Sequence, residues 1–224
     1  MNYTFLSGTD LFHGLKEEEI ETILPCLHAK EKSFPRGASI FRVGDTVSEI
    51  GLIESGSVNI LVNFYWGDRH IFRHAGLGDI FAEDYASIPD KELLCDVMAA
   101  EDTQILFLSL HELLSSCQKR CSFHRQIIHN LVRISASRSL SLSTRMMHTA
   151  PKTIRERLLS YLSEQAMEHG SLHFTIPFSR QQLADYLAVD RSALSNELSK
   201  MQRDGLLTFR KNEFTLKTKP SSRL

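Results

Sequence analysis

Hydrophobic and polar positions follow three successive patterns along this chain of 224 residues. Residues 10–29 mix apolar and acidic positions at helical spacing, which predicts a short amphipathic helix that starts near Lys16 and stops before Pro25. Between residues 31 and 109, short apolar runs alternate with glycine-containing turns, a pattern typical of an antiparallel sandwich or barrel. From about Leu110 the spacing becomes helical. The chain is therefore expected to be α+β, with a strand-rich part followed by a helix-rich part.

The apolar positions within the short runs are expected to fill the interior of the barrel, because alternate side chains of a strand share one face. The predicted interior residues are Ile40, Leu52, Val58, Ile60, Val62, Ile71, Ile105 and Phe107.

Residues 120–148 contain neither Gly nor Pro, which predicts one long helix. Ile127, Leu131 and Ile134 fall at 4-3 spacing, with Phe123 one step earlier, which indicates the start of a coiled-coil-like seam. A helix of this length would protrude from a small domain unless it packed on something. We therefore predict that these four residues contact a second copy of the chain.

The chain is expected to bend at Thr149–Pro151 and to continue into two helices joined by a sharp turn, over residues 179–207. Ser179 and Asp190 are good N-caps for these helices, and Gly205 suits the position just beyond the second one. The inward-packing positions are Leu183, Ala184 and Leu187 in the first helix and Leu194, Leu198 and Met201 in the second. Two short alternating runs then predict a two-stranded wing with a basic turn. Taken alone, the two-helix pattern gives about even odds between a DNA-binding motif and an ordinary helical hairpin with a solvated polar face.

Charge is distributed unevenly along the chain, although its formal net charge is only −1. Residues 150–224 carry 12 Lys and Arg against 8 Asp and Glu, a net charge of +4, and residues 1–149 have a net charge of −5. This mild basic excess around the two-helix pattern supports a DNA partner. The sequence has no apolar run of about 18 residues and no secretory pattern, so we expect a cytoplasmic protein without membrane contact.

Cysteine and histidine residues give weak signals for metal or redox chemistry. The four cysteines, Cys26, Cys95, Cys117 and Cys121, are too few for a disulfide framework in a chain of this length, so reduced thiols are expected. Cys117 and Cys121 lie four residues apart on a predicted helix, but buried structural cysteines are the commoner explanation. His70 and His74 are expected on one face of a strand, a spacing that can chelate a metal. No third ligand is identifiable, and no metal site is predicted.

Barrel, long helix, hinge and winged helix-turn-helix, in this order, resemble the Crp/Fnr family of bacterial transcription regulators. The resemblance is carried by PRGASIFRVGDTVSEIGLIESGSVNI, GLGDIFAEDY and SRQQLADYLAVDRSALSNELSKMQRDGLL. It implies a cyclic-nucleotide-binding-like barrel (a double-stranded β-helix) over residues 1–118, a dimerisation helix and hinge over 119–149, and a winged helix-turn-helix domain over 150–224. It also implies a homodimer without catalytic activity that binds roughly palindromic double-stranded DNA, contacts RNA polymerase and responds to an effector through the barrel.

The sequence departs from the cyclic-nucleotide-binding members of this family at the effector pocket. Those members have Gly-Glu-Leu and, about ten residues later, an Arg and a hydroxyl residue that neutralise the cyclic phosphate. Here Glu83 is present, but Leu93 and Leu94 stand where the Arg and the hydroxyl are expected. Burying an unpaired phosphate costs several kcal/mol, so cyclic AMP is not expected to be the effector. A remaining pocket would be formed by Arg73, Glu83, Leu93, Leu94 and Cys95. The N-terminal cysteine cluster of the iron-sulfur members of the family is absent. The cofactor is therefore not expected to be an iron-sulfur cluster; its identity is unknown, and haem or a redox ligand is an open alternative.

The predicted recognition helix also differs from the familiar pattern of the family, in which a Glu accepts from cytosine. Ser192 replaces that Glu, whereas Arg191 can pair with guanine and Asn196 with adenine. We expect DNA base contacts from Arg191, Ser192, Ser195 and Asn196. We expect DNA phosphate contacts from Arg180, Gln181, Lys200 and Lys211. The preferred operator should therefore differ from the familiar half-sites.

Two other functions remain as alternatives. An effector-free DNA-binding or interaction protein would result if Leu93 and Leu94 filled the pocket. A cupin-type metal enzyme would need three or four ligands at cupin spacing, of which only His70 and His74 qualify, and it would leave the C-terminal third of the chain unexplained. For the regulator, the expected mechanism is a population shift that brings two recognition helices to half-sites about 34 Å apart. The sequence does not determine whether it activates or represses transcription.

Overall fold

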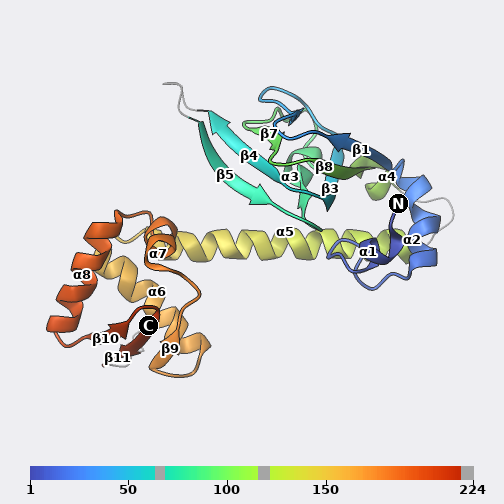
Figure 1. Cartoon of the computed structure of the whole chain (residues 1–224). Coiled ribbons are helices and arrows are strands. Elements are labelled where there is room, and N and C mark those ends of the chain that lie inside the picture. The colour runs from blue at the N-terminus through green and yellow to red at the C-terminus, as the bar shows by residue number, and fades with distance from the viewer. Residues whose placement is uncertain (64–68, 116–121, 218–224) are drawn as a thin grey trace. The chain divides into compact units, whose positions relative to one another are not determined.

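The computed structural model describes residues 1–63, 69–115 and 122–217, which leaves Cys117 and Cys121 outside the described residues. The chain forms two compact units, Met1–Ala136 and Ser137–Leu224 (Figure 1). The helices of the first unit are α1 (Tyr3–Ser7), α2 (Glu17–Ile23), the 3-10 helix η1 (Leu24–Leu27), α3 (Glu83–Ala86) and α4 (Leu110–Leu114). Its strands are β1 (Lys30–Phe34), β2 (Ser39–Phe41), β3 (Glu49–Ser55), β4 (Val58–Asn63), β5 (Arg69–Ala75), β6 (Ile80–Phe81), β7 (Asp96–Ala99) and β8 (Thr103–Ser109). Helix α5 (Ser122–Thr149) follows, and the second unit continues with α6 (Ile154–Glu168), β9 (His173–Thr175), α7 (Arg180–Tyr186), α8 (Arg191–Arg203), β10 (Leu207–Arg210) and β11 (Glu213–Leu216).

The strands of the first unit form two four-stranded antiparallel sheets, with the orders β1-β8-β3-β6 and β2-β7-β4-β5. The space between the sheets is filled by an apolar cluster that includes Val58, Ile60, Ile105 and Phe107, with Ile40 and Val62 packed against it. The predicted α+β class and antiparallel barrel are therefore confirmed, and so are these six interior residues.

A β-bulge in β5 changes which side chains of this strand face the interior. Ile60 pairs with Arg73 and Leu61 with Ile71, so Phe72 is the extra residue. Because opposite residues on paired strands share a face, Arg73 lies on the inner side together with Ile60. Ile71 lies on the outer side and is 60% exposed. The prediction that Ile71 fills the interior is therefore wrong, since simple alternation along the strand fails at the bulge.

Strands β3 and β8 are buried on both faces, because helices of the first unit cover the outer face of their sheet (Figure 1). Leu52 is buried, but it packs in the cluster beneath these helices, and its neighbour Ile53 belongs to the interior. The prediction for Leu52 is thus wrong by one residue. A strand that is buried on both faces carries no alternation from which its inner side could be recognised.

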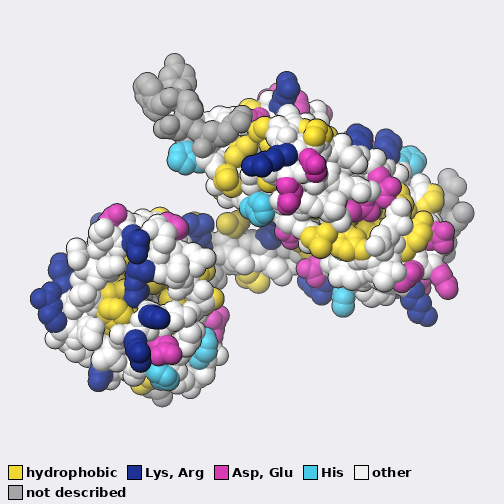
Figure 2. Space-filling model, in the orientation of Figure 1, with side chains coloured by type: hydrophobic (Ala, Val, Ile, Leu, Met, Phe, Trp, Pro, Cys, Tyr) yellow, Lys and Arg dark blue, Asp and Glu magenta, His cyan; other side chains and the backbone are white. Residues whose placement is uncertain are grey.

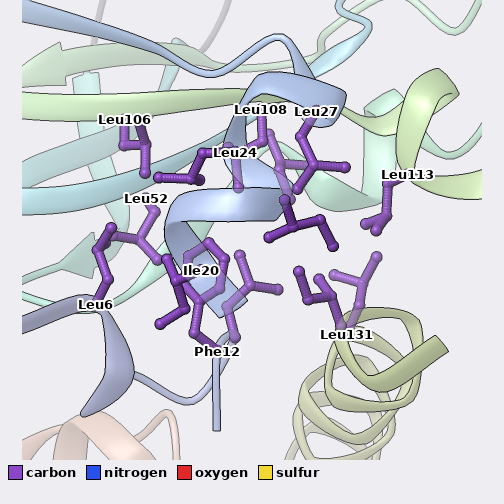
Figure 3. Packing of buried hydrophobic residues seen from close by; sticks show 14 of the residues in the cluster. Leu6, Phe12, Ile20, Leu24, Leu27, Leu52, Leu106, Leu108, Leu113 and Leu131 are labelled. Carbon is purple, nitrogen blue, oxygen red and sulfur yellow. The ribbon is translucent and has the colours of Figure 1, made fainter. Parts of the chain in front are cut away.

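The first half of α5 belongs to the cluster beneath the helices. Ile127 and Leu131 are buried in it, and Phe123 and Ile134 pack against it. Figure 3 shows Leu131 directed toward the same group of side chains as Leu113 and Phe12.

The four residues predicted to contact a second copy of the chain therefore pack within their own unit. Their 4-3 spacing identified the apolar face of the helix correctly, but the N-terminal helices cover this face. Asn130 fixes the contact, because its side-chain amide donates to the backbone oxygens of Leu11 at 2.9 Å and His13 at 2.8 Å. The assignment to a dimer seam is therefore wrong for the buried Ile127 and Leu131, and for the half-buried Phe123 and Ile134 it stays a prediction.

The second unit has a core built from three helices and a three-stranded sheet of order β10-β11-β9. Helix α5 ends at Thr149 and α6 begins after its N-cap Thr153, so the chain breaks where Pro151 predicts it. The hairpin β10–β11 agrees with the predicted wing. Strand β9 has only three residues, HFT, which is too short for a recognisable alternation, and it was not predicted.

Candidate functional site

The helix-turn-helix is formed by α7 and α8, and each helix begins at the residue that the sequence predicts. The hydroxyl of Ser179 accepts from the backbone N–H of Gln182, whose side chain accepts from the N–H of Ser179, which forms a capping box. The carboxylate of Asp190 accepts from the N–H of Ala193 at 2.8 Å. Between the helices, Ala188 has a left-handed backbone with φ of +53°. The sharp turn therefore depends on local capping chemistry, which the sequence displays.

The two helices are held together by their inner faces. All six predicted inward positions, Leu183, Ala184, Leu187, Leu194, Leu198 and Met201, are fully buried. This burial leaves Arg191, Ser192 and Asn196 exposed on the opposite side of α8, with Ser195 partly buried beside them. The second unit thus presents the polar face of a helix to its surroundings.

Three arginines that the sequence analysis did not select hold the two helices in place. The guanidinium of Arg157 on α6 donates to the carbonyl oxygens of Pro151 at 2.8 Å, Leu187 at 3.0 Å and Ala188 at 3.1 Å. The latter two carbonyls belong to the turn between α7 and α8. No sequence signal could have identified Arg157, because its acceptors are backbone atoms and two of them are about thirty residues away.

The other two arginines hold the opposite ends of the pair. Arg145 at the end of α5 donates to the carbonyl oxygens of Asp185 and Tyr186, where α7 ends. Arg155 on α6 pairs with Glu197 at 2.6 Å and with Asp204 at 2.7 Å, which fixes α8 and its end. The orientation of the polar face of α8 is therefore set by contacts with α5 and α6.

The residues predicted to contact phosphate lie on α7, on α8 and at the turn of the wing. Gln181 on α7 and Lys200 on α8 are exposed, although Gln181 donates to Asp185 and Lys200 lies 3.8 Å from a carboxylate oxygen of Glu197. Lys211 is exposed at the turn of the wing. Figure 2 shows Lys and Arg side chains gathered on the drawn face of the second unit, with isolated acidic side chains among them.

Arg180 has a structural partner that the sequence did not reveal. Its guanidinium lies 5.1 Å from the ring centroid of Phe209 and 5.8 Å from that of Phe214, and it donates to the backbone oxygen of Lys211. Burial lowers the pKa of Arg180 from its usual value. This side chain joins α7 to the wing, at the edge of a hollow of about 480 Å³ that Ser179 and Lys211 also line.

In the first unit, the five residues predicted for the effector pocket, Arg73, Glu83, Leu93, Leu94 and Cys95, all line one cavity of about 200 Å³. Glu83 is 2% exposed and begins α3, after Ala82 with a left-handed φ of +64°. Leu93 is 1% exposed and packs into the interior, whereas Leu94 is 66% exposed at the rim. Arg73 donates to the backbone oxygen of Ile80 at 3.0 Å. The bulge in β5 is what brings this guanidinium to the cavity.

Most of the cavity wall is apolar, and its polar groups are few. The hydroxyl of Tyr85, which the sequence analysis did not select, accepts from the N–H of Leu94 at 3.4 Å. Burial raises the pKa of the Cys95 thiol, and the neighbouring Asp96 raises it further. A thiol that stays protonated reacts slowly with oxidants, which disfavours Cys95 as a redox sensor.

The two histidines considered for metal binding do not share a face. His70 pairs with Val62 and His74 with Asn59, and the bulge between these pairs places them on opposite sides of the sheet. His74 instead contacts the side-chain oxygen of Asn59 at 2.8 Å. Within the described residues, no group of three or more His, Cys, Asp or Glu is placed to hold a metal ion. The prediction of a shared face is wrong for the same reason as that for Ile71.

Comparison with known proteins gives two matches to family models. Residues 31–120 match the model of the cyclic nucleotide-binding domain, and residues 156–220 match that of the Crp-like helix-turn-helix domain. The cyclic AMP receptor protein of Thermus thermophilus is 24% identical over 202 residues, which cover 90% of this chain and 89% of that protein. The transcriptional activator protein FnrL of Cereibacter sphaeroides is 21% identical over 187 residues, which cover 79% and 71% of the two chains.

Solved structures agree on the fold. The structure of CprK complexed with OCPA has a TM-score of 0.58 to this chain at 14% identity, and the alignment covers 88% of this chain and 92% of that one. No helix in the described part of this chain has both the length and the apolar character needed to cross a membrane.

Proposed function

Because this chain belongs to the Crp/Fnr family of transcription regulators, we propose that it acts as a homodimer on a roughly palindromic DNA site and answers to a small effector other than cyclic AMP. The observation that carries the proposal is the polar face of α8. This face is exposed, and contacts from Arg157 and Arg155 fix the orientation of its helix. A helix presented in this way, with a wing beside it, suits the major groove of DNA.

Within this proposal, the side chains of α8 have different tasks. Arg191, Ser192, Ser195 and Asn196 are the proposed base-reading residues. Arg191 and Asn196 supply the fork-shaped donor and the amide that suit guanine and adenine. Gln181, Lys200 and Lys211 are proposed phosphate contacts, which position the helix without reading sequence. Arg180 donates one hydrogen bond to the backbone oxygen of Lys211, and its remaining guanidinium N–H groups are proposed to contact phosphate.

Selection of bound DNA from a random pool tests this proposal and gives the operator. Arg191→Ala should relax specificity at one position of each half-site at a cost of about 1–3 kcal/mol. Lys211→Ala should instead weaken all sequences alike and reduce the salt slope by about one. Arg125→Ala, on the exposed side of α5 in the first unit, is the control and should change neither quantity. Failure to enrich any sequence, or equal effects of the first two variants, would contradict the proposed roles.

The proposed dimer contact uses a different face of α5 from the one that the sequence suggested. Val132, Leu142 and Met146 are 62%, 58% and 69% exposed and lie at steps of three and four, with Ser135 and Ser139 between them. Exposed apolar residues at heptad spacing favour a parallel coiled coil with a second copy of α5. Such a pair supports two recognition helices at half-sites about 34 Å apart.

The cavity supports a small and mainly apolar effector. At about 200 Å³ it lies below the range of about 300–1,000 Å³ that pockets for drug-sized ligands occupy. Leu93 and Leu94 offer no charge to a phosphate. Arg73, the hydroxyl of Tyr85 and the carboxylates of Glu83 and Asp84 are the polar groups of the wall that would orient a ligand.

A second candidate is a DNA-binding protein without an effector, which the burial of Leu93 in the interior favours. A thermal-shift screen of small apolar molecules on ligand-stripped protein separates the two candidates. A compound that stabilises wild-type protein, but not Arg73→Leu, and that changes DNA affinity supports the sensor. Contact with RNA polymerase is proposed from the family alone.

A further inference from the structure

A groove in the second unit lies apart from the recognition face and belongs to no site described above. It has a volume of about 400 Å³ and is bordered by the second half of α5, by α6, by Pro177 and Phe178 ahead of α7, and by the end of α7. Its walls include the rings of Tyr161, Phe178 and Tyr186. The centroid of Phe178 lies 5.1 Å from that of Tyr186 and 5.9 Å from that of Tyr161, and the two tyrosine centroids are 5.5 Å apart. Three aromatic rings are thus gathered at one groove.

The same groove is acidic. Glu164 and Glu168 line it, and no Lys or Arg is among the described residues that do so. Their charges act on the rings: burial raises the pKa of the Tyr161 hydroxyl, and Tyr186, Glu168 and Glu164 raise it further. Aromatic walls and a negative potential therefore coincide.

The neighbouring nitrogen groups leave Glu168 without an ion-pair partner among the described residues. His148 contacts Glu164 at 3.0 Å, and the guanidinium of Arg145 lies 5.7 Å from the ring centroid of Tyr186. Arg145 directs N–H groups at the carbonyl oxygens where α7 ends. Glu168 accepts a hydrogen bond from the amide of Gln165 at 2.7 Å and makes no ion pair within the described part of the chain. A cation that enters the groove would provide the positively charged partner that Glu168 lacks.

We propose that this groove binds a small organic cation of the quaternary ammonium class, with its alkyl groups against the half-buried rings of Phe178 and Tyr186 and its charge near Glu164 and Glu168. The ring of Tyr161 is 3% exposed and supports these two rings from the core side. Ring faces attract cations, and cages of aromatic side chains are suited to alkylated ammonium groups. An alkylated ammonium has no N–H to satisfy, so it loses little when ring faces replace water. A bare metal ion would need several oxygen ligands in place of ring faces. An anion would be repelled by the two carboxylates.

The test is to titrate the full chain with choline chloride and to measure binding by calorimetry or NMR. The ionic strength is kept constant by lowering NaCl as choline chloride is added. The matched ligand is 3,3-dimethylbutan-1-ol, which has the shape of choline but carries no charge. Glu168→Gln removes one carboxylate of the groove and keeps the size of the side chain. Glu213→Gln makes the same change at an exposed position of β11, a strand that does not border the groove.

We expect saturable choline binding that is about threefold to fivefold weaker in Glu168→Gln and unchanged in Glu213→Gln. The neutral analogue should bind at least about tenfold more weakly than choline. Phe178→Leu, which keeps an apolar side chain but removes a ring, should also weaken binding. The proposal is overturned if choline does not saturate the protein up to about 10 mM. Equal binding of the neutral analogue, or equal losses in the two glutamine variants, also overturns it. Because this readout uses no DNA, it is independent of the regulator proposal.

Discussion

Replacing Arg157 by Ala should loosen the turn between α7 and α8. Two of the hydrogen bonds from its guanidinium are part-buried, to the carbonyl oxygens of Pro151 and Leu187, and the third, to Ala188, is exposed. A net hydrogen bond contributes about 0.5–1.5 kcal/mol, and charge-assisted bonds lie at or above the upper end of this range. We therefore expect a loss of about 2–3 kcal/mol in the stability of the second unit. Arg157→Lys should recover less than half of this loss, because one ammonium cannot reach three carbonyls that match a planar fork.

Amide hydrogen exchange of the full chain, followed by mass spectrometry, measures this effect locally. Peptides that cover residues 183–190 should exchange roughly 30- to 150-fold faster in Arg157→Ala, the factor that corresponds to 2–3 kcal/mol. Arg203→Ala removes an exposed arginine at the end of α8 and serves as the control. If Arg157→Ala leaves exchange in the turn unchanged, or if Arg203→Ala has the same effect, the holding role assigned to Arg157 is wrong.

Three further predictions concern the first unit and α5. Ala82→Gly should raise the stability of the first unit by about 0.5–1 kcal/mol in urea unfolding, because Ala82 has a left-handed φ of +64°; no gain would show that this backbone is unstrained. Val132→Glu combined with Leu142→Glu should convert a dimer into a folded monomer in light scattering, and a dimer that persists would exclude the proposed face of α5. Burial, together with the charge of Glu31, raises the pKa of Glu54 from 4.5 to about 7. The folded state therefore holds this proton more tightly than the unfolded state, so the contribution of Glu54 to stability is complete below pH 4.5 and is lost as the pH rises through about 7. Urea titrations of Glu54→Gln should show a flatter pH dependence over this interval, and an unchanged slope would contradict the assignment.

Features that depend on neighbouring residues in the chain could be predicted from the sequence. Ser179 and Asp190 begin their helices because a side-chain oxygen reaches a backbone N–H three residues ahead. Gly205 follows α8 with a left-handed φ of +77°, a conformation that costs glycine little. The inward faces of α7 and α8 follow from helical spacing in the same way.

Features that depend on partners far along the chain could not be predicted. The apolar face of Ile127 and Leu131 was identified correctly, but spacing alone does not say whether a second chain or the N-terminal helices will cover it. The acceptors of Arg157 are backbone carbonyls, which every residue possesses. The exposed face of Ile71 follows from a bulge that exists only in the pairing of β4 with β5.

The predicted effector pocket is an intermediate case. The structure places Arg73, Glu83, Leu93, Leu94 and Cys95 around one cavity. They could be predicted together because the family resemblance implied a pocket at these positions. The opposite exposures of Leu93 and Leu94 did not follow from the resemblance. Tyr85 was missed because a tyrosine two residues after Glu83 carries no distinctive signal of its own.

The bulge at Phe72 makes the pairing of β5, and not only its composition, a determinant of which side chains reach the cavity. If β5 paired with β4 without a bulge and kept the pair Leu61–Ile71, Phe72 would lie opposite Ile60 and Arg73 would turn to the outer face of the sheet. Deletion of Phe72, in contrast, would leave Arg73 opposite Ile60 and remove only one side chain from the cavity wall. For engineering the cavity of this scaffold, the phase of β5 is therefore a variable in addition to the identity of its residues.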